Sequence, residues 1–218
     1  MTTDPIRDLT TEPRRRPRGA GTPDLREHIL ATASELFYQR GARAVGVDLI
    51  IEKAGIAKTS LYRYFPTKDD LIVAFLERED VDFWSVWDAV AQRHAGDPAG
   101  ELNAHMGWIG GRLSRENYRG CPQINVAAEF AEQDHPARQV ARRHMQALRA
   151  RMTAIAHRLD VAQAGQLAAQ LAVLVNGAFV SSDVLAGDDP AEVLQASVLA
   201  LITAARAAPA ASQATSFK

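Results

Sequence analysis

The chain has a single cysteine among its 218 residues, Cys121, so it can form no internal disulfide bond. A chain without disulfides suits a reducing compartment, and we expect this protein in the cytoplasm. No apolar run is long enough to span a membrane, because the longest candidate, 167–180, is interrupted by Gln170, Asn176 and Gly177. The first residues also lack the apolar core of a secretion signal. We therefore expect no membrane partner.

The charged residues do not indicate a protein that coats nucleic acid, and the histidines do not indicate a metal site. Lys and Arg number 25 and Asp and Glu 26, for a net charge of -1, so any affinity for DNA must be local. The six histidines form no HExxH motif, no His-x-His pair and no spacing with Cys121 that would bind zinc. The pairs Asp69-Asp70 and Asp188-Asp189 look like turn and cap residues. The sequence therefore predicts that the protein binds no metal and no cofactor and that it is not an enzyme.

No segment alternates apolar and polar residues long enough for a strand, which predicts an all-α fold of about nine helices. Caps, glycines and prolines set the expected limits of these helices. They are from Thr22-Pro23 to Gly41, 47–54, a short helix after Gly55, and then about 67–96, 97–118, 121–132, 134–159, 161–185 and 189–207.

These helices predict two folded domains between two tails. Residues 23–66 are expected to form a helix-turn-helix domain and residues 67–207 a larger helical domain. The segment 208–218 is small and polar enough for a disordered tail. Residues 1–22 are rich in Arg and Pro, which also predicts disorder. That arm could be a solvated tail, and it could also add phosphate or minor-groove contacts. The two interpretations are compatible.

The most informative segment is 53–71, which reads KAGIAKTSLYRYFPTKDDL and contains no acid before Asp69. Gly55 stands where two short helices must turn sharply, since glycine tolerates a positive φ. Leu61 and Phe65 would share the buried face of the second helix. The other side chains then point outward and offer ammonium, guanidinium, hydroxyl and phenol groups, which contact phosphates and base edges. They are Lys58, Thr59, Ser60, Tyr62, Arg63 and Tyr64.

This segment resembles the DNA-binding domain of the tetracycline-repressor (TetR) family of transcriptional regulators, over about 25–71. The densest matches are Ala54-Gly55, Leu61-Tyr62, Tyr64-Phe65, and Lys68 followed by Leu71. The chain departs from the family at three places.

Gly46 and Ala57 stand where the family usually has hydroxyl residues that cap the second and third helices. Alanine cannot accept the free N–H groups, so that end is weaker by ~1 kcal/mol unless a DNA phosphate supplies the acceptor. Thr59-Ser60 replaces the commoner small-residue-then-threonine pair, which leaves the base preference open.

The resemblance implies roles for single residues of the recognition helix. Tyr62, Tyr64 and Lys68 would mainly grip phosphates, and Lys58 would lie near the DNA backbone. Thr59, Ser60 and Arg63 would face base edges.

The resemblance also implies a four-helix dimer interface from the last two helices, although both could be core helices of a monomer. The candidate interface residues are Leu167, Leu171, Leu174, Val175, Ala178, Val193, Leu194, Val198, Leu201 and Ile202.

The middle of the chain gathers aromatic and polar residues that predict a largely apolar ligand pocket, as the resemblance also implies, although each residue could simply be core. The candidates are Phe83, Trp84, Trp87, His105, Met106, Trp108, Ile109, Cys121, Asn125, Glu129, Phe130, Asn176 and Phe179. Residues 120–130, GCPQINVAAEF, also look like a stretch of the ligand domain in some of these regulators. Cys121 could be a redox sensor or a buried structural thiol.

We therefore expect a ligand-responsive homodimer that represses transcription from a near-palindromic double-stranded DNA operator and is released by a small apolar or amphipathic molecule. Ligand binding would move the long helix after Pro66 and so change the spacing of the two recognition helices. Two alternatives stay open: an all-helical protein-interaction module, and a regulator without a small-molecule inducer.

Overall fold

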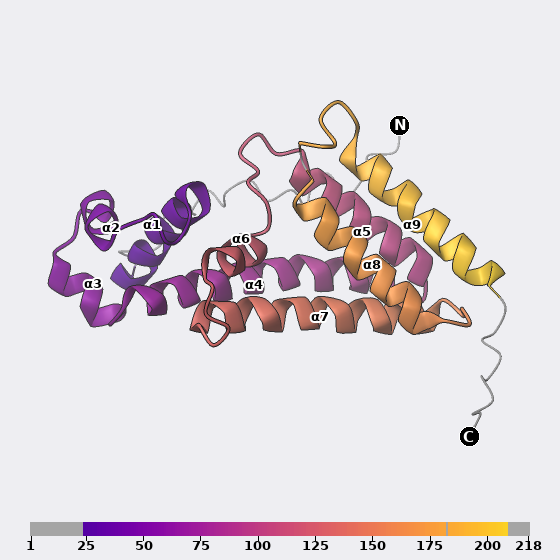
Figure 1. The fold of residues 1–218 in the computed structure, drawn as a ribbon, viewed down its shortest axis with the longest axis horizontal. Helices are drawn as coiled ribbons and strands as arrows, with labels where there is room; N and C mark the ends of the chain where they lie inside the picture. The colour runs from indigo at the N-terminus through magenta and orange to yellow at the C-terminus, as the bar shows by residue number, and fades with distance from the viewer. Residues whose placement is uncertain (1–23, 182, 209–218) are drawn as a thin grey trace, which may run out of the picture. The chain divides into compact units, whose positions relative to one another are not determined.

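The computed structural model describes residues 24–181 and 183–208, and these form nine α-helices and no strand (Figure 1). The all-α prediction is confirmed. The helices are α1 Leu25–Arg40, α2 Val47–Ala54, α3 Lys58–Tyr64, α4 Lys68–Arg93, α5 Pro98–Leu113, α6 Pro122–Glu129, α7 Pro136–Arg158, α8 Ala164–Phe179 and α9 Pro190–Ala207. The predicted arm and nearly all of the predicted C-terminal tail lie outside the described residues.

Helix starts follow the caps in the sequence. Thr67 and Asp70 form the predicted capping box before α4, since the Thr67 N–H donates to Asp70 Oδ2 at 2.9 Å and the Asp70 N–H to Thr67 Oγ1 at 3.1 Å. Asp97 and Asp189 accept backbone N–H groups at the starts of α5 and α9. Asp24 caps α1, and Thr22, the predicted cap, lies outside the described residues.

Three helices are shorter than the sequence predicted. Helix α5 ends at Leu113 instead of about 118, α6 at Glu129 instead of about 132, and α8 spans Ala164–Phe179 instead of about 161–185. The prediction for α8 was wrong at both ends because its apolar composition reports burial rather than where the helical hydrogen bonds stop. Before α8 the backbone turns at Asp160, whose φ is 53°.

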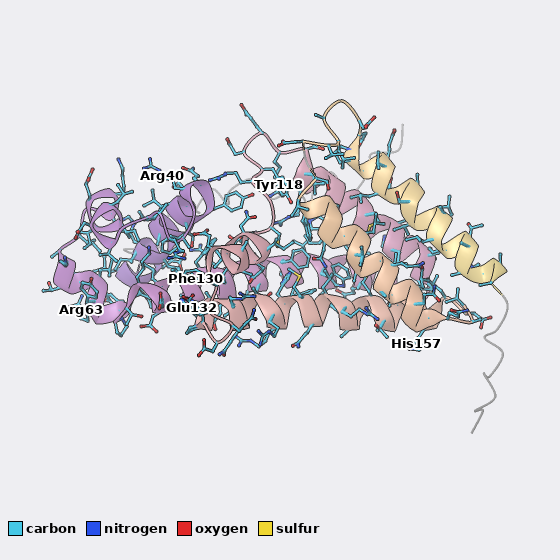
Figure 2. The ribbon with its side chains drawn as sticks, in the orientation of Figure 1. Arg40, Arg63, Tyr118, Phe130, Glu132 and His157 are labelled. Carbon is cyan, nitrogen blue, oxygen red and sulfur yellow. The ribbon has the colours of Figure 1, made fainter. Side chains whose placement is uncertain are left out.

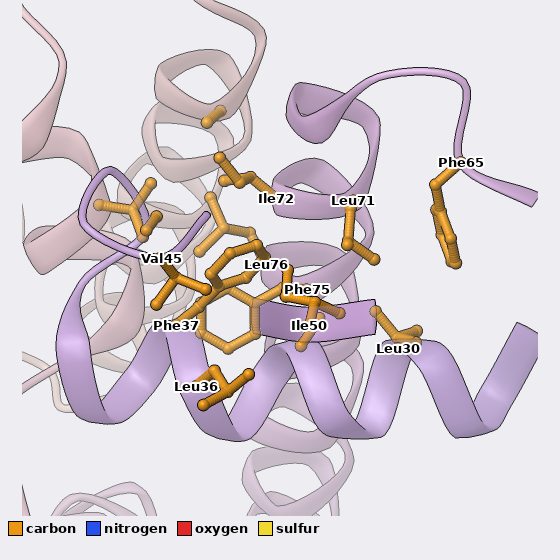
Figure 3. Packing of buried hydrophobic residues seen from close by; sticks show 14 of the residues in the cluster. Leu30, Leu36, Phe37, Val45, Ile50, Phe65, Leu71, Ile72, Phe75 and Leu76 are labelled. Carbon is orange, nitrogen blue, oxygen red and sulfur yellow. The ribbon is translucent and has the colours of Figure 1, made fainter. Parts of the chain in front are cut away.

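The described residues divide into two compact units. The first contains residues 24–84 and 119–144, which are α1, α2, α3, α6 and the first parts of α4 and α7. Its core is one apolar cluster, in which the Phe37 and Phe75 rings lie 5.8 Å apart and Ile50 and Leu71 are fully buried (Figure 3). The helix-turn-helix therefore shares its core with α4.

The second unit contains residues 85–118 and 145–208, which are α5, α8, α9 and the last parts of α4 and α7. Helix α9 packs along α5 and also contacts α8 (Figure 1). At Gly110 of α5 a Cβ atom would lie 2.3 Å from the Cα of Ala191, so only glycine permits this approach of α5 to α9.

Among the described helices, none is both long enough and apolar enough to cross a membrane.

Candidate nucleic-acid interface

The turn between α2 and α3 depends on Gly55, which has φ 65° and ψ 37° in the left-handed region. The Gly55 N–H donates to the Glu52 carbonyl at 3.2 Å and the Ile56 N–H to the Ile51 carbonyl at 3.2 Å, which closes the end of α2. The positive φ predicted at Gly55 is confirmed. His28 of α1 holds the same end, because its Nε2 lies 2.9 Å from the Ala54 carbonyl oxygen.

Two buried apolar side chains anchor one face of α3. Leu61 is 0% exposed and Phe65, just after the helix, is 2% exposed, as their four-residue spacing predicted. The Arg26 guanidinium lies over the Phe65 ring, 5.1 Å from its centroid. In α2, Ile50 is buried and Ile51 is partly buried. Because α3 is anchored on one face, the position of its opposite face is well defined.

The opposite face of α3 carries the predicted donors. Lys58, Thr59, Tyr62 and Arg63 are exposed, and Figure 2 shows Arg63 at the outer surface of α3. The Arg63 guanidinium lies 5.0 Å from the ring centroid of Tyr64.

Ser60 and Tyr64 are half-buried, so they face the solvent only in part. Lys58 forms an ion pair with Asp48 at 3.2 Å, in which both side chains stay mostly exposed. Such a pair is worth at most about 1 kcal/mol, so a phosphate can replace the carboxylate. Helix α3 itself contains no acidic residue.

Helices α2 and α3 start without side-chain caps. Their first residues follow Gly46 and Ala57, and neither provides a side-chain acceptor. The N–H groups of the first turn of α2 therefore keep the partial positive charge that attracts anions, and Asp48 in that turn is the acid nearest to them in sequence.

Lys68, predicted to grip phosphate, is half-buried and engaged within the protein. Its Nζ donates to the Arg43 carbonyl oxygen at 3.1 Å. Burial lowers the pKa of Lys68, while the charges of Glu129 and Asp69 act in the opposite direction. This ammonium joins the start of α4 to the loop between α1 and α2 and uses one of its three N–H donors in that bond.

Glu129, the last residue of α6, holds the same loop. Its carboxylate accepts the Ala42 N–H at 3.0 Å and the Arg43 N–H at 2.6 Å, and the Arg43 side chain donates to the Glu129 carbonyl at 3.0 Å. We call these three hydrogen bonds the Glu129 contact. We predicted Glu129 as a ligand-pocket residue, and no local pattern marks a partner 86 or 87 residues away.

Comparison with known proteins identifies the family of this arrangement. Residues 29–75, from α1 into α4, match the family model of bacterial regulatory proteins of the tetR family. A TetR-family transcriptional regulator from Streptomyces coelicolor has the same fold, with a TM-score of 0.78 and 25% identity over 84% of this chain and 96% of that one.

The chain belongs to the TetR family. The resemblance seen in residues 53–71 is thereby confirmed.

Two relatives of this TetR-family chain align over part of their length. The HTH-type transcriptional repressor NemR of Escherichia coli is 28% identical over 110 residues, 50% of this chain and 55% of NemR. The transcriptional regulator AcuR of Cereibacter sphaeroides is 32% identical over 131 residues, 59% of this chain and 60% of AcuR. The chain therefore spans little more than half the length of these curated relatives.

The predicted pocket residues of this TetR-family chain are divided between the two units. Six belong to the first unit and seven to the second. Those of the first unit are Phe83, Trp84, Cys121, Asn125, Glu129 and Phe130, and those of the second are Trp87, His105, Met106, Trp108, Ile109, Asn176 and Phe179. Nine of the thirteen are buried, which suits core packing, and Trp84, Asn125, Glu129 and Asn176 are half-buried. Asn125 and Glu129 line a cavity beside α1.

His105 is the most unusual of the seven in the second unit. It is 0% exposed and its ring stacks on Trp87 with centroids 3.7 Å apart. Burial, with smaller effects of His94, Arg151 and Arg158, lowers the pKa of His105 to about 3. Neither ring nitrogen has a hydrogen-bond partner among the described residues. Glu101 lies 3.7 Å from Nε2, but its carboxylate is already paired with Arg158.

The predicted dimer interface needs a correction. Most of its residues are buried within the single chain and therefore belong to the core of one protomer: Leu167, Leu171, Val175, Ala178, Leu194, Val198 and Ile202. Leu174 and Leu201 are partly buried, and Val193 is 36% exposed. The prediction chose the most apolar face of each helix, and in the structure that face packs inside the protomer. The strongly exposed apolar side chains nearby are Val173, Val180, Val184 and Leu199.

Proposed function

We propose that this chain is a homodimeric repressor that places α3 in the major groove of a near-palindromic DNA operator and releases it when a small molecule binds. The DNA-binding part is supported by one observation above all: α3 is anchored by Leu61 and presents Thr59, Tyr62 and Arg63 to solvent with no acid among them. With a net charge of only -1, such a local surface is what DNA affinity requires.

The roles of the side chains follow from their chemistry and exposure. Arg63 has an exposed planar guanidinium that can bond a guanine edge in two places. Thr59, one turn earlier on the same face, would read a neighbouring base. Tyr62, Lys58 and Lys68 would bond phosphates, and the N–H groups of the uncapped first turn of α2 would donate to another phosphate.

Two-fold symmetry is supported by the exposed apolar side chains of the last two helices. Val173 and Val180 are seven residues apart, so they share one face of α8 and its end, and they are 73% and 63% exposed. Leu199 of α9 is 66% exposed. Small residues beside it, Ala196 and Ala200, are also exposed and would let a second copy approach closely. A second copy of the chain would cover these side chains and present two α3 helices to two half-sites.

A ligand site in the second unit is supported by polar atoms that lack partners inside an apolar core. These atoms are both ring nitrogens of His105 and the Oδ1 of Asn176. A buried polar atom without a hydrogen bond costs about 1–3 kcal/mol, which a ligand's polar group would recover. Coupling of about 1–3 kcal/mol to DNA binding would change operator affinity roughly 5- to 150-fold. The repressor role follows the name of NemR.

The test of the DNA-binding proposal is selection of binding sites by the full chain from a random duplex library. We expect a site with two related half-sites. The Arg63→Ala variant should then lose about 1–3 kcal/mol of base discrimination at one position in each half-site. The Lys68→Ala variant should weaken binding to all sequences alike.

Arg143→Ala is the matched control, because Arg143 is an exposed arginine of α7 in the same unit. It should leave both affinity and preference unchanged. Identical profiles for the variants of Arg63 and Lys68 would refute the division into base and phosphate contacts. Absence of any preferred duplex would favour an all-helical protein-interaction module.

Ligand response is tested by thermal-shift screening of metabolites and drugs, followed by operator release for each compound that raises the melting temperature. We expect at least one compound that stabilises the chain and lowers operator affinity. Compounds that stabilise the chain without releasing DNA, or a screen with no binder, would favour a regulator without a small-molecule inducer.

A further inference from the structure

A cavity of about 300 Å³ lies within the first unit, and none of its lining residues belongs to the second unit, whose residues are expected to bind an inducer. Its apolar side includes Phe37 of α1, Phe75 of α4 and Val126 of α6, the first two being neighbours in the core (Figure 3). Its polar side includes Arg119 and Glu129. The volume is at the lower end of the range for small-molecule sites, and a cavity with one apolar and one charged side suits an amphipathic ligand.

The main chain of Arg119 makes two hydrogen bonds, whereas its guanidinium makes a single long one. The Arg119 N–H donates to the Tyr38 hydroxyl at 2.9 Å, and the Arg119 carbonyl accepts the Asn125 amide at 2.6 Å. The guanidinium makes one long hydrogen bond, 3.4 Å from Nη1 to the Tyr38 carbonyl oxygen. Four of its five N–H donors make no hydrogen bond within the described part of the chain. The backbone thus places at the edge of the cavity a cation that can bind a ligand.

The carboxylate of Glu129 already has hydrogen-bond donors within the protein. Its two oxygens accept the N–H groups of Ala42 and Arg43, and the Lys68 ammonium is close enough for Glu129 to influence its pKa. Arg43 also donates to the Glu129 carbonyl. The charge in the cavity that lacks a matching partner is therefore the positive charge of Arg119.

We propose that this cavity is a second small-molecule site, in the helix-turn-helix unit, for a compact amphipathic anion. The ligand's apolar part lies against Phe37, Phe75 and Val126, and its anionic group binds the Arg119 guanidinium. Such a ligand has a carboxylate or sulfonate group on a small apolar body.

The site has a regulatory consequence because two of its lining residues also hold the loop before α2. Gly41 ends α1 with φ 89°, and a Cβ atom there would lie 3.2 Å from Glu129 Oε1. The ligand would therefore lie against the Glu129 contact and bias how the loop presents α2 and α3. This consequence depends on the proposed DNA-binding function, whereas binding in the cavity does not.

Binding is tested by calorimetry with two probes of one shape and no DNA present. Naphthalene-2-carboxylate is anionic and naphthalene-2-carboxamide is neutral. We expect the full chain to bind the carboxylate at least about tenfold more tightly, since a charge-assisted hydrogen bond is lost in the amide. The Arg119→Gln variant should bind both probes equally, because its backbone bonds remain and only the charge is removed.

Three further variants locate the site. Arg40→Gln removes an exposed arginine of the same unit that does not line the cavity, and it should keep the preference for the carboxylate. Ala128→Phe places a ring at the exposed edge of the cavity and should abolish binding of both probes. His105→Phe alters the second unit and should change nothing.

Circular dichroism of each variant checks that it is folded. Equal affinity of the two probes for the wild-type chain would overturn the proposal. So would unchanged binding in Arg119→Gln or Ala128→Phe, sensitivity to His105→Phe alone, or no binding by the folded chain at millimolar probe. None of these results would bear on operator binding, which is measured separately.

Discussion

The buried, uncharged state of His105 makes stability depend on pH in a way that one substitution can isolate. The pKa of His105 is about 3 in the folded chain and about 6.5 in the unfolded chain, so below pH 6.5 the unfolded chain binds one more proton. Stability from this group is complete above pH 6.5 and falls as the pH drops from 6.5 toward 3. Integrating between about pH 7.5 and pH 5 gives a loss of about 2 kcal/mol.

The His105→Phe variant should lack this loss. Phenylalanine keeps a ring against Trp87, whose ring lies 3.7 Å from that of His105, and it carries no group that titrates. Urea unfolding followed by tryptophan fluorescence at both pH values gives the free energy of unfolding of each protein. On acidification the variant should lose about 2 kcal/mol less than the wild type.

His157→Gln is the control, because His157 is exposed at the end of α7 in the same unit (Figure 2). Its loss on acidification should match that of the wild type. If His105→Phe lost as much stability between the two pH values as the wild type, the argument from burial would be refuted. The other histidines and carboxylates contribute equally to both proteins, so they cancel in the comparison.

Three further predictions concern the other parts of the chain. Gly55→Ala should lower stability by about 1 kcal/mol, because alanine is strained at φ 65°; an unchanged melting temperature would contradict this. Glu129→Gln should speed hydrogen exchange of the Ala42 and Arg43 amides about tenfold, and unchanged exchange would mean that the carboxylate does not hold the loop. Leu199→Glu should raise the dimer dissociation constant at least about tenfold by sedimentation, whereas a variant that stays as dimeric as the wild type would place the interface elsewhere.

The sequence predicted best the features that depend on local chemistry. Gly55 determines the backbone of the turn, and the pair of Thr67 and Asp70 determines the start of α4. Each acts within a few residues, so both features could be predicted from the sequence alone. Leu61 and Phe65 follow the same logic, because helical spacing alone places them on one face.

The features that the sequence missed depend on residues far apart in the chain. Leu171 and Val198 are equally apolar whether they face a second copy or the interior, and only the packing of α5, α8 and α9 shows that they are buried in one protomer. Glu129 looks like any helical glutamate until α6 is brought against the loop before α2. Periodicity gives the buried face of a helix but not the neighbour that covers it.

Two of the three hydrogen bonds of the Glu129 contact join its carboxylate to main-chain N–H groups, which every amino acid except proline carries. The identity of residue 43, which is exposed, can therefore vary during evolution while the carboxylate keeps both of its main-chain donors. A proline at residue 43 would delete one donor outright. The exposed surface of the loop before α2 can thus diversify while the main-chain support beneath it is inherited unchanged.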